Sequence, residues 1–234
     1  TAITTGGNNT IMGYIAAADI TDNTNNVVIG HRAGNALTDS DNVIIGSDAA
    51  RVGTTHTGNV VIGKTAAGNG AFTADNNVII GKESSLSITT GSSNTIMGAD
   101  SAKTITEGHS SVIIGQNAGA ALTTGHSVVF IGQAAGDNHD TEHDNLGIGR
   151  AALGGAVAGG EFNVAVGNYT LDALTSGDNH TAIGYQAGSG LTTTSNNVFV
   201  GYKAGVLATT CEDNVCIGME AAADGVWTGD DNVV

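Results

Sequence analysis

Short apolar runs that end in glycine recur along the whole chain. Each run holds about three β-branched or aliphatic residues and follows a stretch rich in Asn, Asp, Ser and Thr. The closing glycines are Gly13, Gly30, Gly46, Gly63, Gly81, Gly98, Gly115, Gly132, Gly149, Gly167, Gly184, Gly201 and Gly218. Successive glycines are 16, 17 or 18 residues apart, so the chain is an internal repeat. Positions in a repeat are counted below from this anchor glycine.

The repeat predicts an all-β fold. A unit of about 17 residues is too short for a helix pair, and its β-branched run is typical of a strand. One strand per short unit predicts a parallel β-solenoid, here of about 14 coils, in which each coil stacks on the next. The chain contains no proline, as expected where every strand N–H is needed in a continuous ladder.

Residues 1–234 form one repeat array, with 13 complete anchors and a partial unit at the C-terminus. Neither end carries an atypical capping repeat, which favours a segment of a longer fibre. A second apolar residue stands at position +7 in many repeats and predicts a second strand on the opposite wall. These residues are Ile20, Leu37, Ile88, Ile105, Leu122, Leu174 and Leu191.

Strand side chains alternate between two faces, so positions −3 and −1 share one face and position −2 takes the other. We expect positions −3 and −1 to fill the core of the coil. Position −2 would then point outward and form an apolar stripe too large for a soluble monomer. Its residues are the predicted interface between copies of the chain: Ile11, Val28, Ile44, Val61, Ile79, Ile96, Ile113, Phe130, Ala165, Ala182, Phe199 and Cys216.

Asparagine stands at position −4 in ten repeats. Asparagine tolerates a left-handed turn and can cap the entry to a strand, and stacked asparagines form ladders. We interpret this column as structural.

The charge balance excludes several classes of partner. The 234 residues carry 22 acidic and 7 basic side chains, a formal net charge of −15, which disfavours nucleic acid and anionic lipid. No apolar run is long enough for a membrane helix. No Ser-His-Asp order, phosphate-binding loop or pair of glycosidase carboxylates stands out, so no enzymatic activity is expected.

Two segments resemble known repeats. They are His180-Thr-Ala-Ile-Gly-Tyr-Gln-Ala-Gly188 and Asn197-Val-Phe-Val-Gly-Tyr-Lys-Ala-Gly205. Both resemble the N-T-A-I-G-Y-Q-A-G repeats of phage tail fibres and the N-S-V-A-I-G repeats in the heads of trimeric autotransporter adhesins. The resemblance implies a left-handed parallel β-roll assembled as a homotrimeric rod. The repeat length is closer to the fibre type.

Histidine and aspartate columns are the candidate metal sites. His109, His126 and His143 all stand at position −6, one repeat apart, and the functional interpretation of this column in a trimer is divalent metal binding or pH sensing. The run from His139 through Asp140 and His143 to Asp144 is the richest group of ligand types, but it matches no known metal-ligand spacing. Solvated turn histidines are the favoured interpretation, and no cofactor is expected apart from such divalent cations.

The remaining polar columns have simpler explanations. Thirteen of the acidic residues lie five to eight positions before an anchor, which favours a solvated face that opposes aggregation. Cys216 is expected to be a small buried apolar residue. Threonine pairs such as Thr123-Thr124 could form an ice-binding array, but their register drifts, which favours a role in turns.

The sequence thus predicts a structural and adhesive protein: the trimeric shaft of a phage tail fibre that contributes to attachment to a host surface. A head domain of a bacterial trimeric autotransporter adhesin, or another cell-surface filament, is the first alternative, and an ice-binding β-solenoid is the second. The expected partners are copies of the chain itself and a glycan or protein receptor on the host cell. The expected location is extracellular, on a virion or a bacterial surface.

Overall fold

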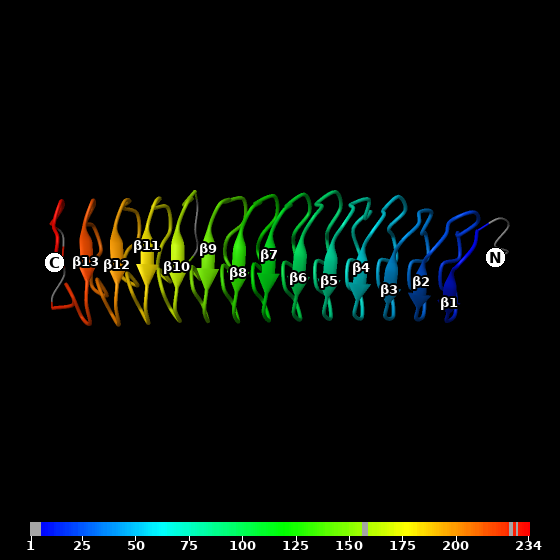
Figure 1. The fold of residues 1–234 in the computed structure, drawn as a ribbon, viewed down its shortest axis with the longest axis horizontal. Coiled ribbons are helices and arrows are strands. Elements are labelled where there is room, and N and C mark those ends of the chain that lie inside the picture. The colour runs from blue at the N-terminus through cyan, green and yellow to red at the C-terminus, as the bar shows by residue number, and fades with distance from the viewer. Residues whose placement is uncertain (1–5, 156–158, 225–226, 228) are drawn as a thin grey trace. The chain divides into compact units, whose positions relative to one another are not determined.

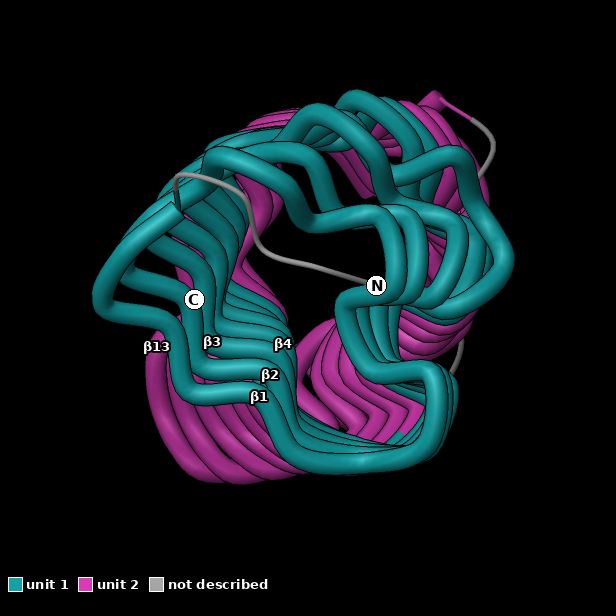
Figure 2. The backbone as a smooth tube through the Cα atoms, turned by 90° about the vertical axis from the view of Figure 1, so that its right-hand side faces the viewer, with its two compact units in different colours: residues 1–116 teal, residues 117–234 magenta. Residues whose placement is uncertain are grey.

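The computed structural model describes residues 6–155, 159–224, 227 and 229–234. The described strands are β1 (Thr10–Met12), β2 (Val27–Ile29), β3 (Val43–Ile45), β4 (Val60–Ile62), β5 (Val78–Ile80), β6 (Thr95–Met97), β7 (Val112–Ile114), β8 (Val129–Ile131), β9 (Leu146–Ile148), β10 (Val164–Val166), β11 (Thr181–Ile183), β12 (Val198–Val200) and β13 (Val215–Ile217). They fall into two compact units (Figure 2): Thr1–Gln116 holds β1 to β7, and Asn117–Val234 holds β8 to β13.

Within each unit the strands pair in parallel and in sequence order (Figure 1). The register is constant, so that Val27 pairs with Val43 in unit 1 and Val164 with Thr181 in unit 2. Beyond β13, Val215 and Val233 form an isolated parallel bridge at the start of a fourteenth repeat. The prediction of an all-β, parallel β-solenoid with one strand before each anchor glycine is confirmed.

The anchor glycine turns the chain at the end of each strand. Gly30 and Gly46 have φ angles of 140° and 139°, in the region that side chains disfavour. A Cβ atom on Gly30 would collide with the carbonyl oxygen of Gly46 in the next coil. Because every anchor meets the next in this way within a unit, the column must be glycine for the coils to stack.

The two faces of the strands are the reverse of the sequence-based expectation. Position −2 lies inside the coil: Val28, Ile44, Val61, Ile79, Ile96, Ile113, Phe130, Ala165, Ala182, Phe199 and Cys216 are all 0% exposed. Ile11, in the first coil, is half-buried. The eleven fully buried side chains are covered by their own chain and cannot contact another copy, so this choice of interface residues is wrong. Positions −3 and −1 lie outside, partly exposed.

The position −4 asparagines explain the inversion. Position −4 is two residues before position −2, so both side chains point to the same face of the extended chain. That face is the interior, where Asn77 is fully buried. Asn77 Oδ1 accepts hydrogen bonds from the backbone N (2.9 Å) and Nδ2 (3.1 Å) of Asn94 in the next coil. Asn77 Nδ2 donates to Asn59 Oδ1 (3.2 Å) and to the Gly91 carbonyl (3.0 Å). The predicted ladder is therefore present, and it bonds each coil to the next.

The left-handed conformation lies one residue earlier than expected. Asn25, Asp41 and Asn76, at position −5, have φ angles of 60°, 64° and 59°. This exposed residue turns the chain, which frees the asparagine at position −4 for the ladder.

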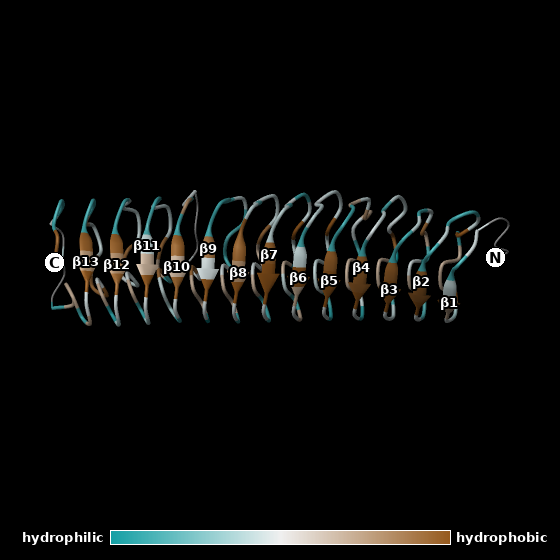
Figure 3. Cartoon of the chain, viewed as in Figure 1, coloured by the Kyte–Doolittle hydropathy of each residue, from teal (hydrophilic) through white to brown (hydrophobic). Residues whose placement is uncertain are grey.

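The position +7 residues are buried as predicted, but they do not form a second strand. Leu37, Ile88 and Leu122 are fully buried, and each lies at the end of a turn. Outside β1–β13, the described residues contain only two isolated bridges. The opposite wall is thus built from stacked turns, while most of the strands carry the brown, apolar colour in Figure 3.

Candidate functional site

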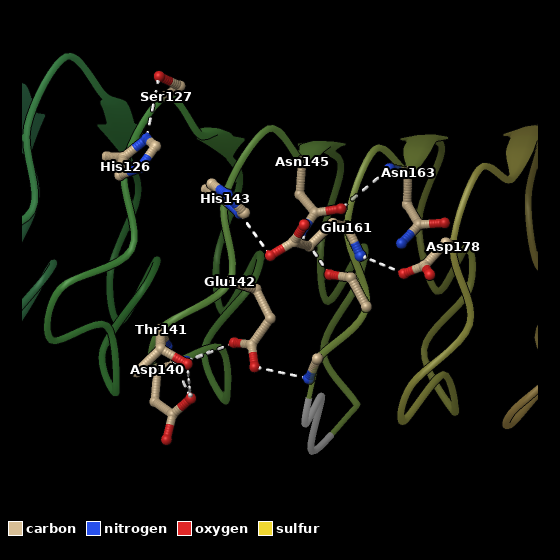
Figure 4. Close-up of polar contacts among 12 residues, drawn as sticks. His126, Ser127, Asp140, Thr141, Glu142, His143, Asn145, Glu161, Asn163 and Asp178 are labelled. Atoms are coloured by element: carbon tan, nitrogen blue, oxygen red, sulfur yellow. Dashed lines mark hydrogen bonds and ion pairs between the residues drawn. The ribbon is translucent and has the colours of Figure 1, made fainter.

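The position −6 column of unit 2 brings two of the predicted histidines together (Figure 4). The rings of His126 and His143 lie 4.7 Å apart, edge to face. His143 Nδ1 lies 2.5 Å from Glu161 Oε1, which makes an ion pair when the imidazole is protonated. His109 occupies the same position in unit 1.

The other predicted ligands do not join this pair. Asp140 Oδ1 accepts from the backbone N of Thr141 (2.6 Å), in a different part of the coil. Glu142, nearly fully buried, accepts from the backbone N of Asp140 (2.9 Å) and of Gly159 (2.8 Å). These carboxylates cap backbone groups within the solenoid and do not point toward the histidines.

His139 lies in the interior, not at the surface. It stands at position +7 from Gly132, where other repeats carry Ile or Leu, and its ring packs edge to face on Phe130 with centroids 5.0 Å apart. It is 0% exposed, and neither ring nitrogen has a hydrogen-bond partner. Burial lowers its pKa from 6.5 to about 4, so His139 is neutral at pH 7. Counting from the anchor would have identified it as a core residue.

The structure therefore does not bring the candidate metal ligands together. In the part of the chain that it describes, no group of three His, Cys, Asp or Glu side chains could hold a metal ion. Asp144 lies at the left-handed position −5, with φ of 57°, and its backbone N donates to the His126 carbonyl (3.2 Å).

Acidic residues at position −6 have a role that the sequence did not reveal. Asp75 Oδ1 accepts from the backbone N of Thr57 (2.7 Å), and Asp178 Oδ1 accepts from that of Glu161 (2.8 Å). Each carboxylate thus receives a hydrogen bond from the turn of the preceding coil. These acidic residues therefore link neighbouring coils as well as contributing to a solvated surface.

Threonines at position +8 also bond between coils. The hydroxyl of Thr89 donates to the Thr106 carbonyl (3.0 Å), and that of Thr175 donates to the Thr192 carbonyl (2.7 Å). These hydroxyls are used within the solenoid, which agrees with the interpretation of the threonine pairs as turn residues.

His180 replaces asparagine in the buried ladder and reproduces its hydrogen bonds. Its Nδ1 accepts from the backbone N of Asn197 (3.2 Å), and its Nε2 lies 2.6 Å from the Thr194 carbonyl. Because Nδ1 is an acceptor, the proton of the neutral ring must be on Nε2, which donates to Thr194. Burial lowers the pKa of His180, which favours the neutral form of the ring.

Both cysteines are buried and free. Burial raises the pKa of Cys211, and it raises the pKa of Cys216 to about 11. Cys216 occupies the interior position −2, as an apolar residue does in the other repeats. A thiol of this kind is protonated and unreactive at neutral pH.

The outer face of the strands is apolar in both units. Its unit 1 residues are Thr10, Met12, Val27, Ile29, Val43, Ile45, Val60, Ile62, Val78, Ile80, Thr95, Met97, Val112 and Ile114. Its unit 2 residues are Val129, Ile131, Leu146, Ile148, Val164, Val166, Thr181, Ile183, Val198, Val200, Val215 and Ile217. We call these two sets the outer strand face. Met12 is 64% exposed and Ile217 61%, while most of the others are partly exposed.

Tyrosines form a column on another side of unit 2. Tyr185 and Tyr202, both at position +1, stack with ring centroids 5.6 Å apart, and Tyr169 meets Tyr185 edge to face at 6.1 Å. Arg150 lies over the Tyr169 ring at 5.4 Å, and Lys203 over the Tyr202 ring at 5.3 Å. We call Arg150, Tyr169, Tyr185, Tyr202 and Lys203 the tyrosine ladder. The sequence signal for it is the shared register after the anchor glycine.

Among the described residues, none belongs to a helix long and apolar enough to cross a membrane. Comparisons of the chain with models of known protein families, with curated protein sequences and with solved structures give no match.

Proposed function

We propose that the chain is a structural segment of a homotrimeric extracellular fibre, the shaft of a phage tail fibre, which contributes to attachment to a host surface. The observation that carries this proposal is the outer strand face. In unit 1 it has 14 positions, and all but Thr10 and Thr95 are Val, Ile or Met. In unit 2 only Thr181, among 12 positions, is polar.

A continuous apolar face of this kind is costly in water. Soluble monomers rarely expose large contiguous apolar patches, and such patches mark interaction sites. Within each unit the face repeats one residue pair per coil, so a second copy of the same chain offers matching side chains at the same spacing. We therefore assign the interface to positions −3 and −1. The number of copies, three, rests on the resemblance to tail fibres and adhesin heads.

The charge distribution is consistent with self-association through this face. The strands contain no Asp, Glu, Lys or Arg, so copies that meet there bury no charge of either sign. The acidic side chains lie in the turns instead, where solvent and salt screen those that are exposed. A mechanical shaft needs this combination of a dry contact between subunits and a charged exterior.

The mass of the native assembly tests the proposal. Light scattering on the purified chain should give about three times the chain mass of 23.1 kDa. The double variant Val60→Lys, Ile62→Lys places two charges on the outer strand face and should dissociate the assembly without loss of the β-sheet signal in circular dichroism. Thr55→Lys adds a charge at an exposed turn and should leave the mass unchanged. A monomeric wild-type chain would contradict the proposal.

The adhesin alternative differs in where the assembly sits. Antibodies raised against the chain should label the tails of purified virions in electron microscopy if it belongs to a tail fibre. Labelling of the bacterial surface, with none on virions, would instead support an adhesin head.

A further inference from the structure

The tyrosines and the basic residues of this chain share one side of the coil. All four tyrosines stand at position +1 or +2, and all seven Lys and Arg residues stand between +1 and +5. The turn before each strand contains neither Lys nor Arg. The tyrosines and the Lys and Arg residues are therefore confined to the arc that follows the anchor glycine, and in unit 2 five of them form the tyrosine ladder.

We propose that the tyrosine ladder is a binding platform for an extended neutral polysaccharide, an inference that names a ligand for the adhesive role and rests on that proposed function. The ladder is accessible, since Tyr185 is 40% and Tyr202 45% exposed, and Arg150 is also exposed. A tyrosine offers an apolar ring and a hydroxyl at its tip, and a pyranose offers apolar C–H groups and hydroxyls around its rim.

The ladder is ordered before any ligand arrives. The rings of Tyr185 and Tyr202 are nearly parallel, at 13°, and each ring contacts a neighbour in the next coil. Lys203 and Arg150 hold the two ends by lying over the outermost rings. Side chains that are already fixed lose little entropy on binding, which favours affinity for a ligand that makes only weak individual contacts.

The periodicity of the ladder favours a polymer over a globular partner. Each of the four consecutive coils that begin at Gly149, Gly167, Gly184 and Gly201 presents at least one aromatic or cationic group of the ladder. These coils follow one another at the spacing of parallel strands, about 4.8 Å. This rise is comparable to the length of one sugar unit in an extended polysaccharide. Successive sugars can then occupy successive coils, and several weak contacts on one chain combine.

The charge of the protein favours a neutral polymer. The chain has a formal net charge of −15, so its field opposes the approach of uronic or sulfated polysaccharides. The two cations of the ladder lie over tyrosine rings, where they can still donate hydrogen bonds to sugar hydroxyls.

Affinity electrophoresis of the full chain tests the inference. The native gels contain laminarin, dextran or galactomannan as neutral probes, and alginate as the acidic probe. We expect at least one neutral polysaccharide to retard the wild-type chain. The double variant Tyr185→Leu, Tyr202→Leu should bind that polysaccharide about tenfold or more weakly.

Two further variants separate binding from folding. Tyr14→Leu makes the same change at position +1 of unit 1, where Tyr14 stacks on His31, and should keep full retardation. Tyr202→Phe keeps the ring stack and removes one hydroxyl, so it should fold normally and lose part of the affinity. The thermal midpoint of each variant, followed by circular dichroism, shows whether the fold is retained.

The inference is overturned if none of the three neutral polysaccharides retards the chain, or if alginate alone does. Equal retardation of wild type and of a folded double variant also overturns it. Should the double variant not fold, unchanged binding by Tyr202→Phe counts against the inference, and weakened binding supports it. A trimer that labels virion tails but binds no polysaccharide would leave the fibre proposal standing. A monomer whose sugar binding depends on Tyr202 would reject the fibre and retain the platform.

Discussion

A Cβ atom placed on Gly136 would lie 2.6 Å from three atoms of the Phe130 ring. These two residues stand at positions +4 and −2 of one coil, and the ring fills the space that a side chain on Gly136 would need. The next coil reverses the sizes, with Gly147 at −2 and Leu153 at +4, where a Cβ atom on Gly147 would lie 3.5 Å from Leu153 Cδ1. In these two coils positions −2 and +4 therefore share one interior volume, and the large residue stands at one position or at the other.

Gly136→Ala should destabilise the protein more than the same change at Gly34. Both glycines stand at position +4 in a left-handed conformation, with φ of 57° and 49°. At Gly34 the nearest atom to a Cβ is Ile44 Cδ1 at 3.1 Å, so Gly34→Ala meets mainly the backbone penalty, about 1 kcal/mol. Gly136→Ala adds a clash with Phe130, and we expect a loss of about 2–4 kcal/mol in the free energy of unfolding by urea denaturation.

Phe130→Leu provides the matched rescue. Combined with Gly136→Ala, the smaller side chain should recover part of the loss, which a double-mutant cycle measures as a coupling free energy. Strict additivity of the two changes would show that the two positions do not share a volume.

His139→Leu should stabilise the protein, most strongly at acid pH. The folded-state pKa of His139 is about 4, below its ordinary value of 6.5, so the unfolded chain takes up the proton first. Stability is therefore fully present above about pH 6.5 and is lost as the pH falls toward 4, by about 3 kcal/mol for this group. Leucine removes that loss. It also removes two unpaired buried nitrogens, which should raise the free energy of unfolding at pH 7 by about 1 kcal/mol.

Thermal melts between pH 7.5 and 4.5 check this prediction. The pH dependence should become shallower in His139→Leu without vanishing, because burial also lowers the pKa of His56 to about 4. His31→Leu, at an exposed histidine, is the control and should keep the wild-type profile. An unchanged pH dependence in His139→Leu would mean that His139 is not buried as a neutral group.

Asn77→Ala should lower the free energy of unfolding by about 2–4 kcal/mol, because it removes the acceptor for Asn94 and leaves the buried Gly91 carbonyl without its donor. Asn69→Ala, at an exposed asparagine, should change the free energy of unfolding by less than about 0.5 kcal/mol. Urea denaturation of the two variants gives the comparison. Similar values would argue against the ladder as a source of stability.

His180→Asn restores the residue that the ladder has elsewhere. Asparagine can accept from the Asn197 backbone N and donate to the Thr194 carbonyl, as the imidazole does, so stability at pH 7 should stay within about 1 kcal/mol of wild type. Below pH 6 the variant should be the more stable, since protonation of Nδ1 would break the bond from Asn197. Chemical denaturation at pH 7 and pH 5 measures the free energy of unfolding of the variant and of wild type at each pH. A variant that is less stable than wild type at pH 5 would contradict this role of His180.

The sequence predicted the repeating architecture because the period is carried by residues with a backbone requirement. The anchor glycines need a positive φ and a close approach to the next coil, and no other residue satisfies both conditions. The prediction of the faces failed because alternation separates two faces without saying which is inside. The sequence did contain a sign of which face is inside: the residue sizes at Phe130 and Gly136, and at Gly147 and Leu153, compensate for each other.

The candidate sites were harder to predict, because their chemistry depends on whether a side chain is buried or exposed and on which groups it contacts. His139 and His143 are four residues apart in sequence, yet one is fully buried at an apolar position and the other contacts Glu161. Register alone would have separated them, since only His139 stands at +7. The tyrosine ladder involves contacts between coils that no single repeat reveals.

The constant register also sets how each unit folds. Every ladder bond within a unit joins residues about one repeat apart, such as Asn59 to Asn77 or Gly30 to Met12. The loop that must close to add a coil is therefore the same 16 to 18 residues wherever growth occurs, so contact order does not rise with the number of coils. Folding can begin at any adjacent pair of coils and spread in both directions. Lengthening such an array should leave the rate of each growth step unchanged.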